Sequence, residues 1–433
     1  MSDILLPLHS GQILTLTIDE VGGKGDGIAR VNNHLIFVPL TCAQDIVQVE
    51  VISVGKDFSR GRLLEVIEPS PQREGTICPH FGRCGGCQLQ HIAAESYYTL
   101  KQNILVQAVQ KCGGDISSVT EIFPVAQGQR RRVEYKVAVN KGVVSIGFYF
   151  SSSHDVVDIS DCPVTDKVLV EWIEPLRSHI ATLKKKGNVS LINMTHAVNG
   201  VDILITVRSP LHSADRKSWV DFASHHGAII RLSIIEQGAN SIAEVLYSGD
   251  VIMNFSDVEV MLPIGSFLQA TGQGQEIITQ HVVDHLGLCN SVVDLYCGCG
   301  TYSFPLAQKG IRVHGYEGSD PMVRAMHNAA RRGGFDHLLT TAVRDLFDNP
   351  LSKDELSAYD GVVINPPRNG AEPQTKQLAI SNVSTVVMVS CNPATFSRDA
   401  GHLIRGGYKL ITAIPIDQFL YTAHLELVAV FQR

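Results

Sequence analysis

The pattern of hydrophobic and polar positions divides the chain into segments of different kinds. Residues 10–68 contain short runs rich in β-branched and apolar residues, separated by Gly and Asn, which is typical of closely spaced strands. Several short strands in one small segment predict a small barrel. A Pro-containing linker follows, and residues 92–112 place apolar residues near helical spacing.

The second half of the chain shows two further textures. Residues 130–262 are β-rich with some helix, whereas from residue 263 apolar strands alternate with helical stretches. That alternation predicts a mainly parallel, doubly wound sheet. We therefore expect an α/β plus β protein with an OB-like barrel at 1–70, a small β-rich domain at 71–262 and a Rossmann-like domain at 263–433. Within the middle segment, residues 92–124 are expected to pack on the Rossmann-like domain.

Composition and charge limit the functional classes. Hydrophobic residues make up 44% and charged residues 18% of the 433 residues, as in soluble globular proteins. The N-terminus lacks the features of a secretion signal, so we expect a cytoplasmic protein with no membrane partner. The net charge of -7 argues weakly against nucleic acid, but residues 56–141 hold 12 Lys/Arg against 8 Asp/Glu, including Arg130–Arg132. These charges fit either a local phosphate-binding face or an ordinary solvated surface.

A candidate cofactor site lies at residues 292–307, which predict a buried strand, a glycine turn and a helix. Gly298 and Gly300 allow a ligand to approach the backbone closely. Glu317 ends the next strand, where an acidic residue can bind ribose hydroxyls, and Asp345 is placed to reach an adenine. NAD and S-adenosylmethionine look alike in this geometry, and an ordinary strand–helix turn is the alternative. The form D-x-x-C-G-x-G resembles motif I of methyltransferases and favours S-adenosylmethionine.

Cys391 is the candidate nucleophile. A predicted strand ends there, Asn392 is a good N-cap and Pro393 a good first helical residue. A cysteine at a helix N-terminus is expected to have a lowered pKa, because the helix dipole stabilises the thiolate. A buried core cysteine is the alternative.

A cysteine nucleophile together with a base is what methyl transfer to carbon 5 of uracil needs. Carbon 5 is a poor nucleophile unless a thiolate adds to carbon 6, and a base must later remove the carbon-5 proton. Glu426, before the apolar run LVAVF, is the candidate base, with a strand-edge surface glutamate as the alternative. The loop Asn365-Pro366-Pro367-Arg368 follows another strand. Arg368 stands where amino-methyltransferases carry an aromatic residue, which counts against amino chemistry.

A cysteine cluster combines Cys78, Cys84 and Cys87 with the distant Cys162. Three close thiolates and one distant thiolate suit an iron–sulfur cluster or tetrahedral zinc, and unrelated free thiols are the alternative. Cys297 and Cys299 are a possible further ligand pair, but we expect them to fill small spaces beside the cofactor.

The glycine loop, N-P-P-R-x-G, S-C-N-P-A-T and H-L-E occur in this order, and the chain resembles the RNA uracil-5-methyltransferases over essentially its whole length. The resemblance implies a TRAM RNA-binding domain at 1–70, Cys391 as nucleophile and Glu426 as base. It implies S-adenosylmethionine as methyl donor and a 4Fe-4S cluster on the four cysteines. It also implies cofactor contacts from six residues: Gln269, Tyr296, Thr301, Glu317, Asp345 and Asn365.

Two departures and three alternatives accompany the resemblance. The family usually has Asp where Asn365 stands, and Thr301 replaces a frequent Asn. A TRAM domain with a cysteine cluster is most similar to the members that methylate a specific uridine of 23S rRNA, so we expect a monomer acting on that RNA. The alternatives are another rRNA or tRNA uridine, a non-catalytic ribosome-assembly protein, and an iron–sulfur methylthiotransferase. The last requires C-x3-C-x2-C, whereas this chain has C-x5-C-x2-C.

Overall fold

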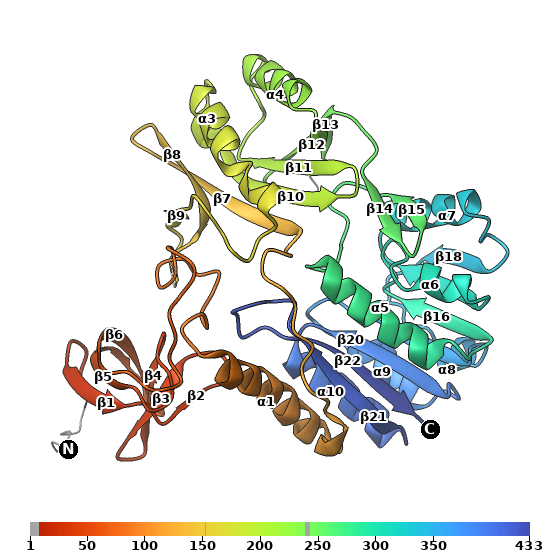
Figure 1. The fold of residues 1–433 in the computed structure, drawn as a ribbon. Helices are drawn as coiled ribbons and strands as arrows, with labels where there is room; N and C mark the ends of the chain where they lie inside the picture. Colours follow the sequence, from red (N-terminus) through yellow and green to blue (C-terminus); the bar gives the residue numbers. More distant parts are fainter. Residues whose placement is uncertain (1–7, 152, 239–242) are drawn as a thin grey trace.

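The computed structural model describes residues 8–151, 153–238 and 243–433, and its N-terminal sheet stands to one side of the molecule (Figure 1). This sheet has the order β1-β5-β6-β4-β3-β2. Its strands are β1 (Ile13–Thr17), β2 (Glu20–Val21), β3 (Gly27–Val31), β4 (His34–Val38), β5 (Ile46–Val54) and β6 (Phe58–Glu68). Alternate residues of β1 and β5 are buried, so each strand turns one apolar face to a small core.

The central sheet has the order β13-β12-β11-β10-β7-β8-β9, and β11 and β12 are its parallel pair. Its strands are β7 (Arg132–Asn140), β8 (Val143–Tyr149), β9 (Val156–Asp158), β10 (Val189–Ala197), β11 (Gly200–Val207), β12 (Ile229–Glu236) and β13 (Glu244–Tyr247). The helices of this region are α2 (Lys167–Val170), α3 (Ile173–Thr182) and α4 (Ser213–His225). Helices α3 and α4 lie on the same side of the sheet (Figure 1) and pack into one apolar core with it.

The C-terminal sheet has the order β18-β17-β16-β19-β20-β22-β21, with β22 antiparallel to both neighbours and the remaining pairs parallel. A hairpin, β14 (Ile252–Phe255) and β15 (Val258–Met261), precedes it. Its strands are β16 (Ser291–Leu295), β17 (Arg312–Glu317), β18 (Leu339–Val343), β19 (Gly361–Ile364), β20 (Thr385–Ser390), β21 (Lys409–Ile416) and β22 (Glu426–Gln432). Its helices are α5 (Gly272–Leu286), α6 (Ser303–Gln308), α7 (Asp320–Arg332), α8 (Lys353–Leu356), α9 (Glu372–Ala379) and α10 (Pro393–Arg405).

Helices cover both faces of this sheet, so its central strands β16, β19, β20 and β22 are buried on both sides. Helices α5, α6 and α7 contribute to one apolar core, and α8, α9 and α10 to the other. The parallel strands end at one edge, which is where such sheets bind ligands. The prediction of a doubly wound C-terminal domain is therefore confirmed. No helix in the described ranges is both long and apolar enough to cross a membrane.

Helix α1 (Ala94–Cys112) lies beside α10 and β21 (Figure 1), although the whole central sheet separates it from them in sequence. Leu105 and Val109 are fully buried in the core that α10 also enters, and the Ser397 hydroxyl donates to the Ala108 carbonyl over 2.9 Å. The apolar face of α1 therefore packs against α10 and β21 of the C-terminal domain.

Candidate active site

A cleft of about 870 Å³ lies between the central sheet and the carboxyl edge of the C-terminal sheet. It brings together most of the residues that the sequence singles out: Gln269, Tyr296, Gly298, Glu317, Asp345, Asn365, Arg368, Cys391 and Glu426. Glu134, Asn193 and Thr195, on β7 and β10, line the opposite wall. Thr301 is not part of the cleft wall, so the structure does not support a direct ligand contact for it.

The glycine loop between β16 and α6 has the open backbone that a ligand needs. Gly298 and Gly300 have φ values of 57° and 95°, and Tyr296 shares the left-handed conformation with φ 62°. A Cβ at Gly298 would contact nothing, whereas a Cβ at Gly300 would lie 2.7 Å from the Phe304 ring. Gly298 therefore leaves space in the cleft, and Gly300 permits close packing of α6.

Two carboxylates hold this loop. Glu317 accepts hydrogen bonds from the backbone N–H groups of Gly298 (3.1 Å) and Ser319 (2.9 Å). Asp294, fully buried at the end of β16, accepts from the Ser303 hydroxyl over 2.6 Å, and burial raises its pKa to about 7. Glu317 thus links the loop to the end of the neighbouring strand β17.

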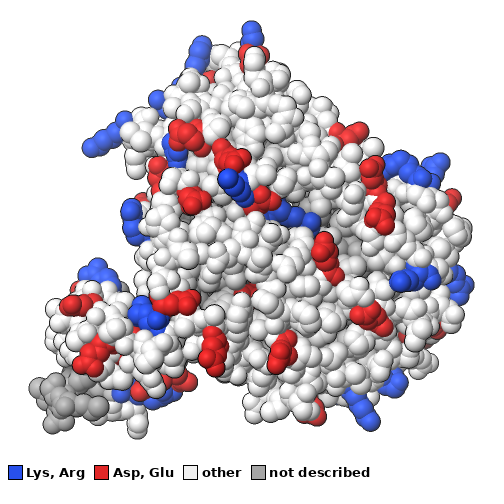
Figure 2. Space-filling model, viewed as in Figure 1, with Lys and Arg blue, Asp and Glu red and all other residues white. Residues whose placement is uncertain are grey.

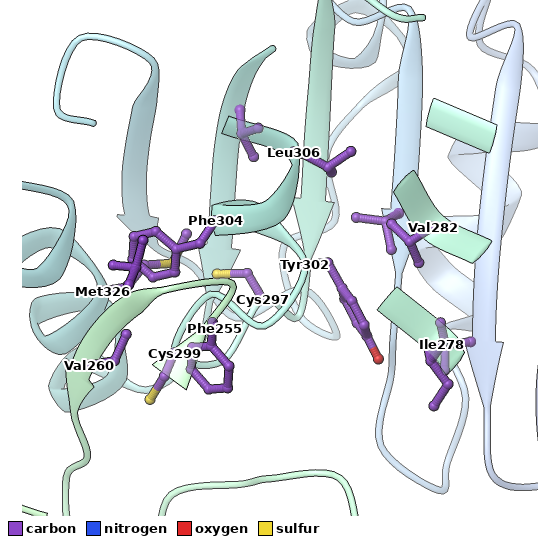
Figure 3. Close-up of a cluster of buried hydrophobic side chains, with 14 of the residues drawn as sticks. Phe255, Val260, Ile278, Val282, Cys297, Cys299, Tyr302, Phe304, Leu306 and Met326 are labelled. Carbon is purple, nitrogen blue, oxygen red and sulfur yellow. The ribbon is translucent and has the colours of Figure 1, made fainter. Parts of the chain in front are cut away.

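Cys297 and Cys299 belong to the core beneath the loop. Figure 3 shows both side chains among Phe255, Phe304 and Met326, and their exposed fractions are 4% and 2%. Burial raises the pKa of both thiols, that of Cys299 to about 11. They fill space, as expected, and neither reaches the cleft as a nucleophile.

At the third strand, Asp345 lies in the turn after β18. Its carboxylate accepts from the Phe347 backbone N–H over 2.9 Å. The Phe347 ring lies 5.7 Å from the Tyr296 ring, and both rings line the cleft. The arrangement offers an apolar wall beside a carboxylate, which suits a purine with an exocyclic amine.

Cys391 directly follows β20, and α10 begins at Pro393. The Asn392 side chain accepts from the Ala394 backbone N–H over 3.1 Å, which confirms the N-cap. Burial first, and then Glu426, raises the pKa of the Cys391 thiol, while the Arg368 guanidinium lowers it. The expected lowered pKa is therefore wrong for the free protein, because desolvation outweighs the helix N-terminus and Arg368.

Glu426 is the first residue of β22 and is only 2% exposed, so it is not a surface glutamate. Gln418 donates from Nε2 to Glu426 Oε2 over 2.7 Å. Burial raises the pKa of Glu426 to about 8 and Gln418 opposes this shift. A carboxyl with this pKa can exchange a proton near neutral pH.

Sequence reasoning missed Gln418 and Tyr302. The same Gln418 Nε2 also donates to Gln269 Oε1 over 2.8 Å, and Gln269 Nε2 donates to the Tyr302 hydroxyl over 3.0 Å. Asn365 Nδ2 donates to that hydroxyl over 3.4 Å. Asn365 thus acts through an N–H that an aspartate lacks, and only its position next to known motifs could have pointed to Tyr302.

Comparison with known proteins identifies the family of this chain. The sequence model of the tRNA (uracil-5-)-methyltransferases matches residues 235–433, and that of the TRAM domain matches residues 7–64. An RNA methyltransferase of Caulobacter vibrioides is 36% identical over 431 residues, 96% of this chain and 99% of the relative. The chain belongs to the RNA uracil-5-methyltransferase family.

One further relative and one solved structure have more specific names. The 23S rRNA (uracil(1939)-C(5))-methyltransferase RlmD of Stenotrophomonas maltophilia is 30% identical, covering 96% of each chain. The crystal structure of Pyrococcus abyssi tRNA (uracil-54, C5)-methyltransferase with S-adenosyl-L-homocysteine has a TM-score of 0.72 at 22% identity, covering 96% of this chain and 100% of that one. The structural likeness shows that the two proteins share a fold.

The three consecutive arginines of this methyltransferase are mainly braces. Arg131 donates to the Gln269 carbonyl (3.2 Å) and to Gln275 Oε1 (2.7 Å), and Arg132 donates to the Leu268 carbonyl (2.7 Å). These bonds fasten the start of β7 to the segment before α5 and to α5 itself. Basic and acidic side chains are interspersed on the face in Figure 2. Arg131 is engaged in these bonds, whereas Arg130 and Arg132 line the cleft, and phosphate binding by this stretch stays a prediction.

The four cysteines of the predicted cluster line one cavity of about 280 Å³ beside the cleft. Arg130, Arg368 and Phe419 line both spaces. Backbone bonds from Gly85 to the Tyr149 carbonyl place the cysteine segment at the end of β8. In the part of the chain that the structure describes, no three His, Cys, Asp or Glu side chains are close enough together to hold a metal ion.

Proposed function

We propose that this protein transfers a methyl group from S-adenosylmethionine to carbon 5 of a uridine in 23S rRNA, at the position equivalent to uracil 1939. The observation that carries the proposal is the pairing of Cys391 and Glu426 on the wall of one cleft beside the glycine loop. The choice of 23S rRNA rests on relatives in Stenotrophomonas maltophilia and Shewanella amazonensis that are named for that target.

The cleft fits S-adenosylmethionine. Gly298 leaves room for a ligand at the loop, and the edge of the cleft beyond it offers carboxylates and aromatic rings. We propose that Glu317 binds the ribose hydroxyls, Asp345 and Phe347 hold the adenine, and Tyr296, Gln269 and Asn365 complete the site. The bound donor supplies an electrophilic methyl group on a sulfonium.

The chain supplies the remaining chemistry. The target uridine must leave its stack to reach Cys391, since its ring is otherwise covered by neighbouring bases. Cys391 first gives up its thiol proton to solvent beside the Arg368 guanidinium, and the Sγ thiolate then adds to carbon 6, which moves the electron pair of the ring double bond to carbon 5 and the 4-oxygen. After carbon 5 has gained the methyl group, the Glu426 carboxylate accepts the proton from carbon 5. The double bond re-forms and Cys391 leaves as a thiolate.

Arg368 assists the nucleophile. Its guanidinium favours the ionised form of the Cys391 thiol, and it lines the cleft at that point. At the cleft mouth, Phe267 is 53% exposed, and the Arg132 guanidinium lies 5.3 Å from its ring centre. We propose that this exposed ring stacks on a base, as aromatic side chains do with unstacked nucleotides.

Mapping of 5-methyluridine tests the proposal. In a strain without this protein, the methyl group at position 1939 of 23S rRNA should disappear, and the gene with Cys391 intact should restore it. Loss of 5-methyluridine from a tRNA or from another rRNA position instead would keep the chemistry and refute the target. An unchanged set of methylated uridines would favour a non-catalytic RNA-binding protein and refute the proposal.

We also propose that Cys78, Cys84, Cys87 and Cys162 hold a 4Fe-4S cluster. The support is the donor set: four cysteines, from two segments of the chain, line one cavity, and thiolates are the ligands such clusters use. The ligand-free arrangement would have to draw the sulfurs together, since no metal site is preformed among the described residues. The cluster would hold the two segments together and has no part in methyl transfer.

Anaerobically purified protein should therefore be brown and contain about four iron atoms per chain, the content of one 4Fe-4S cluster. Replacement of Cys87 by serine should remove the iron, whereas replacement of Cys112, which lies in α1, should not. Metal analysis and visible absorption measure both. One zinc per chain without iron would refute the iron–sulfur proposal.

A further inference from the structure

The segment 417–425 joins β21 to β22 and leads directly into Glu426, the first residue of β22. A buried lysine that the proposed chemistry does not use holds this segment. Lys101 of α1 is 0% exposed, and its ammonium donates to the carbonyls of Phe419 (3.2 Å), Thr422 (3.0 Å) and His424 (2.5 Å). The buried Asp417 carboxylate lies 2.6 Å from the same nitrogen. An ammonium bound by several oxygens fixes the backbone of the segment.

A second contact holds the start of the segment. The Tyr97 hydroxyl, also on α1, donates to Asp417 Oδ2 over 2.6 Å and accepts from the Tyr421 backbone N–H over 2.9 Å. Gln418 therefore directly follows Asp417, which is held by both Lys101 and Tyr97. Burying an ionic group costs free energy unless it is paired. Any conformation of the segment that separates this buried lysine from this aspartate is therefore disfavoured.

Gln418 turns this anchoring toward the base. Its side chain is 2% exposed, and the two N–H bonds of Nε2 serve the two acceptors Glu426 Oε2 and Gln269 Oε1. Gly274 of α5 presses against it, because a Cβ there would lie 3.0 Å from both Cβ and Oε1 of Gln418. The amide therefore has little room to turn. In the described structure, Gln418 is the hydrogen-bond partner of the Glu426 carboxyl.

We infer that Gln418 is a positioning residue that orients the Glu426 carboxylate for removal of the carbon-5 proton and stabilises its ionised form, with the Lys101–Asp417 pair holding Gln418 in place. The inference rests on the proposed function, in which Glu426 is the base. Gln418 would thereby affect the rate of the last chemical step, the removal of the carbon-5 proton after the methyl group has moved.

The groups around Glu426 make its ionisation depend on Gln418. Cys391 at the end of β20 and Tyr302 before α6 interact electrostatically with it, and the pKa of each is raised, so both are neutral near pH 7. Gln269 and Gln418 are neutral amides. The charges of Lys101 and Asp417 pair with each other behind the segment. Gln418 is therefore the donor on which the Glu426 carboxylate relies.

Gln418→Met, which keeps the side-chain length and removes the donor, tests the inference. Turnover should fall about tenfold, as expected for a lost hydrogen bond to a charged group. The rising limb of the turnover–pH profile should move up by about one pH unit, a tenfold change in ionisation. Capture by RNA containing 5-fluorouridine should keep the wild-type rate, since capture needs Cys391 and no proton removal. A methylated RNA–protein adduct should accumulate with ordinary RNA.

Gln374→Met is the matched control. Gln374 of α9 is equally buried and bonds to the backbone of Leu351, away from the cleft. Its loss should lower thermal stability without moving the pH profile. Lys101→Met should reproduce the Gln418 phenotype in the fraction that folds, with capture per folded molecule unchanged.

An unmoved pH profile in Gln418→Met, or equal losses in capture and turnover, would overturn the inference while leaving the proposed function intact. If wild-type protein methylates uridine but is not captured by fluorinated RNA, the covalent mechanism and this inference both fail.

Discussion

Replacement of Cys391 by alanine is expected to abolish methyl transfer and covalent capture while RNA binding persists. Cys391 follows β20 at the cleft wall, and the cap formed by Asn392 does not depend on its side chain. Alanine should therefore leave α10 in place. Without a nucleophile, carbon 5 of the uridine stays unreactive, so the rate should fall by roughly four orders of magnitude or more. Transfer of a tritiated methyl group and a binding titration measure the two effects separately.

Cys289→Ala is the control for the loss of a thiol, since Cys289 lies after α5 and outside the cleft wall. It should retain wild-type transfer. Persistence of the covalent species in Cys391→Ala would assign the nucleophile to another residue. If that residue were Cys297 or Cys299, the result would also contradict the arrangement around the glycine loop, because both thiols are buried in the core.

Glu426→Gln is expected to fail at a different step. The variant keeps the shape of the side chain and loses the ability to accept a proton. Cys391 should still add and the methyl group should still move, but the carbon-5 proton should remain and the thiol should stay attached. Turnover should fall by about a thousandfold, within the range for loss of a general base. A methylated RNA–protein adduct that survives denaturing electrophoresis should accumulate.

The double variant Cys391→Ala, Glu426→Gln is the control and should yield no adduct. Normal turnover in Glu426→Gln would show that another group removes the proton. Loss of turnover with neither adduct nor methylated RNA would place Glu426 before methyl transfer and contradict the proposed sequence of steps.

The C-terminal sheet could be predicted because apolar runs in the sequence indicate its buried strands. Strands β16 and β20 are buried at every position, as parallel strands covered by helices are. The segment of strand β10 was not singled out within the β-rich region, although Asn193 and Thr195 alternate with the buried Ile192 and Met194 and line the cleft.

The candidate site could be predicted only where a residue stands in a short motif. Cys391 with its Asn392 cap is such a case. The charge environment could not be predicted, because the pKa of Cys391 and of Glu426 depends on burial by distant elements. Lys101 was invisible for the same reason: its partners lie more than three hundred positions later in the chain.

The measurement that tests the covalent mechanism most directly is the capture of wild-type protein by 23S rRNA containing 5-fluorouridine, followed by identification of the linked peptide. Fluorine cannot leave carbon 5 as a cation, so the adduct cannot resolve. We expect one stable species in which the methylated nucleotide is attached to Cys391, formed only when S-adenosylmethionine is present. Attachment to another residue, or normal methylation of uridine RNA by protein that fluorinated RNA never captures, would contradict this expectation.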